Sequence, residues 1–241
     1  HLFYDDFQAR KETEDFLEKH FELAYAQEIP TSKVPSIRRA PLIWRYFVTP
    51  LQKRLKNSLL DEEEYVVRCV NRINGEYKGA YVFSSGKNMG IFKAVGYPED
   101  VGEFYRLDEY AGYAWTCHGR YPTNTPGWWG GAHPFGLLDY SVVHNGEISS
   151  YDTNRRYIEQ FGYKCSLQTD TEVITYIIDY MLREKNLTLE EINGPYEYNT
   201  GLVIVEALKG IDVMAIPAVL CKNHGPFTWG KDCLEAVHNS V

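Results

Sequence analysis

Three short polar signatures hold the side chains of this sequence that are best suited to chemistry. They contain Arg120, the pair Asn145 and Gly146, and Asp170, and 25 positions separate each signature from the next. An arginine guanidinium binds an α-carboxylate with two charge-assisted hydrogen bonds, and an aspartate accepts hydrogen bonds from an α-ammonium group. The sequence therefore predicts a site for a zwitterionic amino acid.

Asn145 and Gly146 add two hydrogen-bond donors to this set. A glycine lets a ligand approach its backbone N–H closely, because it has no side chain. The Asn145 amide and the Gly146 N–H together suit the oxyanion of a tetrahedral intermediate. Asn-Gly is also a common hairpin turn, so taken alone the pair has a purely structural interpretation. The even spacing to Arg120 and Asp170 favours the catalytic interpretation.

At these signatures the sequence resembles the class II glutamine amidotransferases, whose nucleophile is N-terminal. The stretch that holds Arg120 and Thr123 resembles the segment that binds the α-carboxylate of glutamine. Residues 144–148, with the sequence His-Asn-Gly-Glu-Ile, resemble the oxyanion turn of that family. Residues 169–172, with the sequence Thr-Asp-Thr-Glu, resemble the segment whose aspartate binds the α-ammonium group, which here is Asp170.

The amino-acid sequence of residues 120–125 and 132–135 is most similar to that of the amidotransferase domain of glutamate synthases. The resemblance implies an α+β fold, the four-layer αββα sandwich of N-terminal-nucleophile hydrolases. It also implies hydrolysis of the glutamine side-chain amide to glutamate and ammonia through a cysteinyl thioester. The ammonia would pass to a glutamate-synthase-like subunit or domain. The sequence holds no flavin, nicotinamide, iron–sulfur or metal motif, so no cofactor is expected in this chain.

The nucleophile is where the sequence departs from the resemblance. The family uses an N-terminal cysteine, whereas position 1 is His1 and the first cysteine is Cys69. We expect the first strand and the catalytic cysteine to precede His1. The alternative is a non-catalytic amino-acid-binding or scaffold subunit that has lost the nucleophile. A relocated nucleophile at Cys117 is disfavoured, because that residue falls in a predicted strand without an obvious base nearby.

A loop rich in glycine and proline follows the first signature, at residues 122–134. Long structureless connections in compact domains usually have a function. Trp128 and Trp129 stand beside glycines, so this aromatic pair could cover a small ligand and exclude water. By resemblance the segment is the flexible glutamine loop. The other interpretation is a loop that two tryptophans simply anchor.

Alternating strand-like and helix-like patterns would position these signatures. We expect the strand that ends before Arg120 and the strand that ends before Asn145 to carry the first two of them. Thr169 and Glu172 fit a capping box, so Asp170 could also serve only to stabilise a helix N-terminus. Strands are predicted at residues 2–4, 65–70, 79–84, 88–92, 113–118, 135–138 and 140–143, and helices at 8–25, 98–106, 153–161 and after Thr169.

A single amidotransferase-like domain over residues 1–241 is the predicted organisation. Residues 27–58 are basic and proline-containing, which predicts an extended arm or insertion. This arm would either dock an acidic partner subunit or act as a solvated connector. The resemblance ends near residue 193, and the segment 193–241 has only a weaker pattern of two buried strands, at residues 201–207 and 213–220.

Composition excludes several functional classes. A net charge of −8 over 241 residues argues against binding to a nucleic-acid backbone, which requires clustered Lys and Arg. The longest apolar run is about half of the ~20 residues that a membrane-spanning helix needs. Five cysteines without a Cys-x-x-Cys pair indicate neither a disulfide framework nor a zinc site. We therefore expect a cytoplasmic protein that does not bind nucleic acid or membrane.

Overall fold

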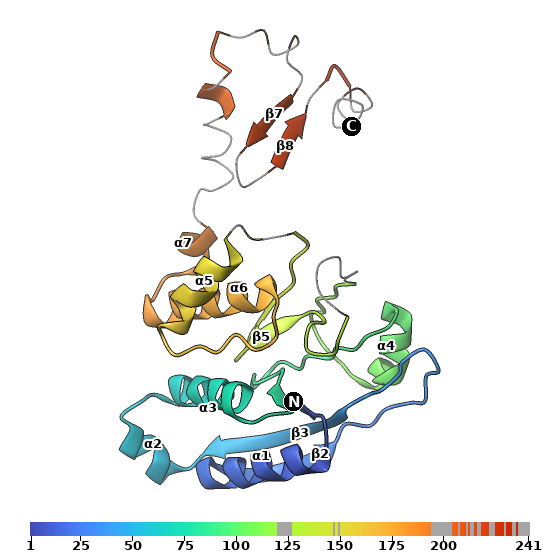
Figure 1. Ribbon diagram of the computed structural model, residues 1–241, viewed down its shortest axis with the longest axis vertical. Coiled ribbons are helices and arrows are strands. Elements are labelled where there is room, and N and C mark those ends of the chain that lie inside the picture. The colour runs from blue at the N-terminus through green and yellow to red at the C-terminus, as the bar shows by residue number, and fades with distance from the viewer. Residues whose placement is uncertain are drawn as a thin grey trace. The chain divides into compact units, whose positions relative to one another are not determined.

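The computed structural model divides the chain into two compact units, His1–Glu184 and Lys185–Val241. The sequence predicted one domain over the same residues. Figure 1 shows the order of helices and strands along both units. The structure describes residues 1–119, 127–146, 148, 150–193, 204–206, 208–210, 212, 215, 218–221, 225–228, 230–232 and 235.

A four-stranded sheet in the order β2-β3-β1-β4 forms one side of unit 1. Strand β1 pairs antiparallel with β3 and with β4, and β2 pairs antiparallel with β3. The prediction of a strand at residues 2–4 is confirmed, and so is a strand near residue 80. The strands are β1 (Leu2–Tyr4), β2 (Phe21–Glu28), β3 (Leu42–Pro50) and β4 (Ala80–Val82).

Strand β3 corrects the prediction of an extended arm at residues 27–58. The longest strand of the sheet lies inside this stretch, and helix α2 (Gln52–Ser58) follows it. Ile43 is buried, while Trp44 and Tyr46 pack against the core from the other face of the strand. Apolar side chains on both faces of the strand thus pack against the core, and the stretch forms a strand despite its basic neighbours.

Helix α3 (Glu62–Glu76) replaces the strand that was predicted at residues 65–70. The Asp61 side chain caps this helix by accepting a hydrogen bond from the Glu64 backbone N–H (2.8 Å). Three glutamates follow in its first turn, where negative charge is favourable. The β-branched residues of the run suggested a strand, but their apolar side chains pack into the core on one face of the helix that Asp61 caps. Its buried residues follow helical spacing and include Tyr65, Cys69, Val70 and Ile73.

The remaining elements of unit 1 mostly follow the sequence. Asp6 caps helix α1 (Phe7–His20), and Pro98 opens helix α4 (Pro98–Phe104). Helix α1 ends at His20, so residues 21–25, which were predicted as helical, instead belong to strand β2. Residues 88–92 and 113–118, predicted as strands, form no regular element. The predicted strands β5 (Phe135–Leu137) and β6 (Tyr140–Val142), which form a hairpin, are confirmed, and so are helices near the positions of α5 (Tyr151–Glu159) and α6 (Asp170–Asp179). A 3₁₀ helix, η1 (Leu107–Glu109), and a π-helix, η2 (Tyr180–Glu184), complete the unit.

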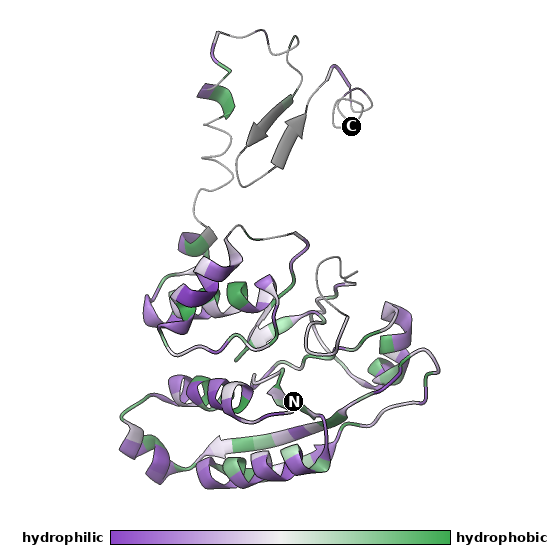
Figure 2. Cartoon of the chain, in the orientation of Figure 1, coloured by the Kyte–Doolittle hydropathy of each residue, from purple (hydrophilic) through white to green (hydrophobic). Residues whose placement is uncertain are grey.

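Two hydrophobic clusters form the core of unit 1. The first cluster joins α1, the sheet, α3 and α6 through residues such as Phe16, Ile73 and Val173. The second contains Phe3 and Trp129 and lies under the loops that follow β4. Helices α1 and α3 carry hydrophilic as well as hydrophobic residues, as expected for helices with one buried face (Figure 2).

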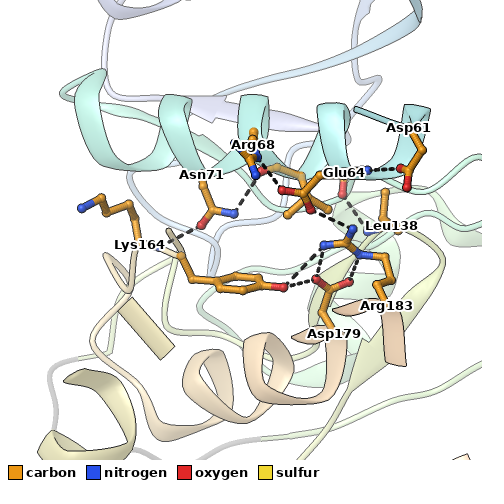
Figure 3. Close-up of polar contacts among 11 residues, drawn as sticks. Asp61, Glu64, Arg68, Asn71, Leu138, Lys164, Asp179 and Arg183 are labelled. Atoms are coloured by element: carbon orange, nitrogen blue, oxygen red, sulfur yellow. Dashed lines mark hydrogen bonds and ion pairs between the residues drawn. The ribbon is translucent and has the colours of Figure 1, made fainter. Parts of the chain in front are cut away.

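A buried ion-pair network joins α3 to the end of α6 (Figure 3). Arg183 Nη1 lies 2.9 Å from Glu64 Oε2, and Arg183 Nη2 lies 2.8 Å from Asp179 Oδ2. The Asn71 side chain also accepts a hydrogen bond from the Lys164 backbone N–H (2.8 Å). These contacts fix the helix that carries Asp170 against the helix that covers the sheet.

Unit 2 contains helix α7 (Leu189–Asn193) and an antiparallel hairpin of β7 (Ala218–Cys221) and β8 (Gly225–Thr228). Strand β7 overlaps one predicted strand, whereas residues 204–206 are helical where a strand was predicted. Within the part of the chain that the structure describes, no helix is long and apolar enough to cross a membrane.

Candidate functional site

Asp170 is the first residue of α6, and its carboxylate contacts residues on both sides of the Asn145-Gly146 turn. Oδ2 accepts a hydrogen bond from the Ile148 backbone N–H (3.2 Å), and His144 Nδ1 lies 3.5 Å from the same oxygen. The Asp170 side chain is only 15% exposed. The turn with Asn145 is therefore tied on both sides to one largely buried carboxylate.

A chain of contacts leads from Asp170 to the first signature. The Thr171 hydroxyl donates to Asp170 Oδ1 (3.3 Å), and His133 Nε2 lies 2.8 Å from that hydroxyl oxygen. Because the hydroxyl hydrogen is directed to Asp170, His133 Nε2 carries the proton in this arrangement. The His118 ring stacks on His133 with the ring centroids 4.4 Å apart. His118 stands two positions before Arg120, so the segment that leads into the first signature lies close to the second and third signatures at the start of α6.

Asn145 and Gly146 are exposed in the turn between these contacts. Within the described residues the Asn145 side chain has no hydrogen-bond partner, so its amide is open to a ligand. A Cβ at residue 146 would lie 3.0 Å from His144 Nε2, which is tighter than most real Cβ contacts. Glycine at this position lets the His144 ring pack over the turn.

Arg120 and Thr123 lie outside the described residues, which leave out 120–126. Their contact with a ligand stays a prediction. Gly119 is the last described residue before them, next to His118 in the histidine stack. The site therefore has a described acidic and amide side, to which the predicted arginine would add the carboxylate-binding group.

The two tryptophans pack into the second hydrophobic cluster. Trp129 is 9% exposed and its ring lies 5.8 Å from that of Phe104, while Trp128 contacts Tyr81 edge-on at 5.6 Å. Trp128 also folds back over its own loop, since a Cβ at Gly130 would lie 2.3 Å from its ring. This is the arrangement of an anchored loop. Closure of the tryptophan pair over a ligand stays a prediction.

Glu172 is buried near Asp170, and its carboxylate makes other hydrogen bonds than the residue at that position of a simple capping box. The Glu172 backbone N–H donates to the N-cap Thr169 (3.1 Å), but the carboxylate accepts from the backbone N–H groups of Ser166 (2.9 Å) and Leu167 (2.8 Å). Burial raises the pKa of Glu172 to about 7. Glu172 thus fixes the turn that leads into α6 rather than only its first residue.

Lys93 is a functional candidate that the sequence reasoning missed. Its side chain is 2% exposed, and Nζ donates to the Gly130 carbonyl oxygen (3.1 Å). Burial lowers the pKa of Lys93 to about 7. One signal in the sequence could have indicated this burial: Lys93 is the single charged residue in the otherwise apolar run at residues 91–95. A lysine is rarely buried, so its place in such a run is unusual.

The cysteine thiols of unit 1 show no sign of activation. Cys117 is exposed and lies outside any strand, which corrects the prediction that a strand contains it. Cys69 is buried in α3, and burial raises the pKa of its thiol to about 12. A reactive thiol requires a lowered pKa, so Cys69 is suited to packing rather than to nucleophilic attack.

Comparison with known proteins adds two family matches. Residues 8–180 match the family described as glutamine amidotransferases class-II. Residues 140–241 match the family described as class II aldolase and adducin N-terminal domain. The two matches overlap at residues 140–180, where α6 and Asp170 lie.

Two relatives are similar to parts of this chain. An uncharacterized protein of Archaeoglobus fulgidus is 52% identical over 194 residues, which cover 80% of this chain and 51% of that protein. L-ribulose-5-phosphate 4-epimerase UlaF of Salmonella paratyphi B is 49% identical over 55 residues, which cover 23% of this chain and 24% of the epimerase. The chain thus spans about half the length of the archaeal relative. No solved structure matches it.

Proposed function

The chain belongs to the class II glutamine amidotransferases, and from this membership we propose that it hydrolyses the side-chain amide of glutamine to glutamate and ammonia. One observation supports the proposal: the Asp170 carboxylate accepts a hydrogen bond from the Ile148 N–H beside the Asn145 turn, and the Thr171 hydroxyl links it to His133, whose ring stacks with that of His118. The contacts support a common location for the second and third signatures, and the proposal adds the groups of the first signature, Arg120 and Thr123, to it.

Each polar group has a proposed role toward glutamine. Asp170 accepts hydrogen bonds from the α-ammonium, and Arg120 with Thr123 binds the α-carboxylate. The Asn145 amide and the Gly146 N–H stabilise the oxyanion that forms when a nucleophile adds to the side-chain carbonyl. Asp170 retains free lone pairs for this task, because a carboxylate offers about four acceptor positions and the described contacts use only some of them.

The nucleophile in this proposal is the N-terminal cysteine that the family uses. The thiol passes its proton to an adjacent base and adds to the side-chain carbonyl carbon. As the tetrahedral intermediate collapses, the base returns this proton to the leaving nitrogen, so that the C–N bond breaks and ammonia departs. Water then hydrolyses the thioester to release glutamate. We propose the four-layer αββα sandwich as the complete fold, a finer assignment than the mixed α+β structure of unit 1.

The ammonia acceptor is proposed to be a glutamate-synthase-like subunit or domain. This proposal rests on the amino-acid sequence of residues 120–125 and 132–135, which most resembles that of the amidotransferase domain of glutamate synthases. We also propose a reducing, cytoplasmic environment, because Cys69, Cys117 and Cys165 are free thiols in the described part of the chain.

The boundary between the units, after Glu184, lies just beyond the end of the amidotransferase match at residue 180 and inside the aldolase match at residues 140–241. Residues 140–184 belong to unit 1, where α6 packs into the same core as the sheet. We therefore propose that the amidotransferase relationship governs His1–Glu184 and that the aldolase relationship concerns Lys185–Val241. This proposal replaces a single domain with an amidotransferase unit followed by a segment of different ancestry.

Glutamine turnover by the full-length protein tests the function. The wild type should release ammonia from glutamine, and a thiol-directed glutamine analogue should label it at one cysteine. Asp170→Asn should raise KM by about 10- to 100-fold, the effect expected from loss of a charged hydrogen-bond acceptor. Asp152→Asn, an exposed carboxylate of α5, is the matched control and should behave as wild type. Glutamine binding without turnover would instead favour a non-catalytic amino-acid-binding subunit.

A further inference from the structure

Lys93 is a buried cation whose contacts point to a specific task. Its ammonium donates to the Gly130 carbonyl oxygen (3.1 Å) and lies 4.1 Å from the centroid of the Phe135 ring. Its backbone carbonyl accepts from the Tyr105 hydroxyl (2.8 Å), which fixes the point from which the side chain extends. Removal of an ammonium from water is costly unless its new contacts compensate, so the Gly130 contact is more than incidental packing.

Gly130 is the centre of a tight turn that carries both tryptophans. The Gly131 N–H donates to the Trp128 carbonyl (3.1 Å), and the Ala132 N–H donates to the Trp129 carbonyl (3.2 Å). The Gly130 carbonyl is the next acceptor along this turn, and Lys93 is the side chain that binds it. A charged donor to a buried carbonyl is among the stronger single hydrogen bonds in proteins.

Glu172 is the acidic residue that interacts electrostatically with Lys93. Both side chains line one small internal cavity of about 10 Å³, together with Asn74, Phe135 and Tyr176. That volume is close to the space that one water molecule needs. Lys93 forms no direct ion pair within the described residues. Both side chains thus line the same cavity, and the Glu172 carboxylate favours the charged form of Lys93. Glu172 also accepts hydrogen bonds from the turn before α6.

We propose that Lys93 is a positioning residue for the tryptophan turn at residues 128–131, with Glu172 as its counter-charge. One buried pair then fixes two parts of the site at once. Lys93 holds the turn that carries Trp128 and Trp129, and Glu172 holds the entry into the helix that begins with Asp170. The consequence for glutamine binding rests on the proposed function, whereas the control of the turn itself does not.

Amide hydrogen exchange of the full-length protein tests the positioning role directly. Lys93→Met retains the length of the side chain but removes the donor and the charge. Amides of residues 127–132 should exchange at least about tenfold faster in this variant, because local opening no longer breaks a charged hydrogen bond. Lys87→Met is the matched control on the same segment, since the Lys87 side chain is 67% exposed and pairs only with Glu62. Its exchange at residues 127–132 should equal that of the wild type.

Glu172→Gln is the second variant and keeps the test decisive if Lys93→Met folds poorly. It removes the counter-charge and one backbone acceptor, so exchange should quicken both at residues 165–168 and at residues 127–132. Unchanged exchange at residues 127–132 in every variant that folds would overturn the proposal.

Glutaminase kinetics supply a separate readout. Lys93→Met should raise KM by about tenfold with little change in kcat, because the turn positions the ligand rather than the reacting bond. Faster exchange at the turn in a protein without glutaminase activity would sustain the positioning role and refute only the proposed function. A fall in kcat with unchanged KM and unchanged exchange would refute the positioning role alone.

Discussion

The backbone N–H of Ile148 donates a hydrogen bond to the Asp170 carboxylate across 3.2 Å. The contact joins the residue just after the Asn145 turn to the first residue of α6. Because the carboxylate also has His144 3.5 Å away, the turn and the helix start behave as one unit.

Asn145→Ala should reduce kcat for glutamine hydrolysis by about 100- to 1000-fold with little change in KM. An oxyanion donor acts mainly in the transition state, so its loss affects kcat rather than ground-state binding. Steady-state kinetics of the full-length protein measure the effect, with Asn57→Ala on the exposed surface of α2 as control. An unaltered kcat would remove Asn145 from the oxyanion site.

Arg120→Ala should weaken glutamine binding and leave kcat largely intact. The α-carboxylate is equally charged in the ground state and the transition state, so its partner contributes uniform binding. We expect KM to rise by about 10- to 100-fold, the loss expected for a charged hydrogen bond. The exposed Arg156 of α5 offers the matched substitution, Arg156→Ala. If both variants had wild-type KM, the assignment of Arg120 would be wrong.

Lys93 should make stability depend on pH above neutrality. Its pKa is about 7 in the folded protein and near its ordinary value in the unfolded chain, so the unfolded state binds more protons between about pH 7 and pH 10. The free energy of unfolding contributed by Lys93 therefore rises with pH in that window, by at most about 1.4 kcal/mol per pH unit. Glu172 has the opposite effect at lower pH, because burial raises its pKa to about 7 and the folded state then binds more protons.

The difference between wild type and Lys93→Met isolates the lysine contribution. Chemical denaturation at several values between about pH 7 and pH 9 should show the wild type gaining stability relative to the variant as pH rises. Tyr176 lines the same cavity, but burial raises its pKa well above the ordinary value, so it does not titrate in this range. A constant difference across the range would show that Lys93 titrates normally.

Arg183→Ala should destabilise unit 1 by about 3 to 5 kcal/mol. The change leaves Asp179, which is buried, and Glu64 without their common cation, and an uncompensated buried charge is costly. Arg72→Ala removes an exposed ion pair on the same helix α3 and should cost less than about 1 kcal/mol. Urea denaturation of both variants measures the contrast. Equal effects would mean that the network in Figure 3 is no stronger than a surface pair.

A chain that ends at Glu184 should fold with the stability of unit 1 in the longer chain. Every residue of the two hydrophobic clusters lies between Leu2 and Tyr180, so the described core loses nothing by this truncation. Thermal unfolding followed by circular dichroism provides the comparison. A chain that ends at Asp179 is the control and should be less stable, since it loses the buried Tyr180 and the Arg183 network. If the chain that ends at Glu184 failed to fold, the two units would have to be regarded as one domain.

The sequence alone determined those parts of the structure that depend on neighbouring residues. Asp6, Pro98 and Thr169 each mark the start of a helix, because caps and a fixed proline φ act within one turn. Gly162 lies just beyond the end of α5 at Glu159 and has a positive φ, which a glycine adopts without strain. The resemblance at the three signatures likewise needed only the order of residues, and it led to the family.

Only the tertiary structure decided what depends on partners far along the chain. Residues 65–70 became helix rather than strand because their apolar side chains found a core on one helical face, which a short apolar run cannot reveal. The stretch 42–50 joined the sheet because β1 and β2 were available to pair with it. Lys93 gives no sign in sequence of its contact with Gly130, 37 positions away, and the stacking of His118 on His133 is equally hidden. Such contacts arise from packing, since the free energy that buries a charge or stacks two rings comes from the assembled core and not from the local chain.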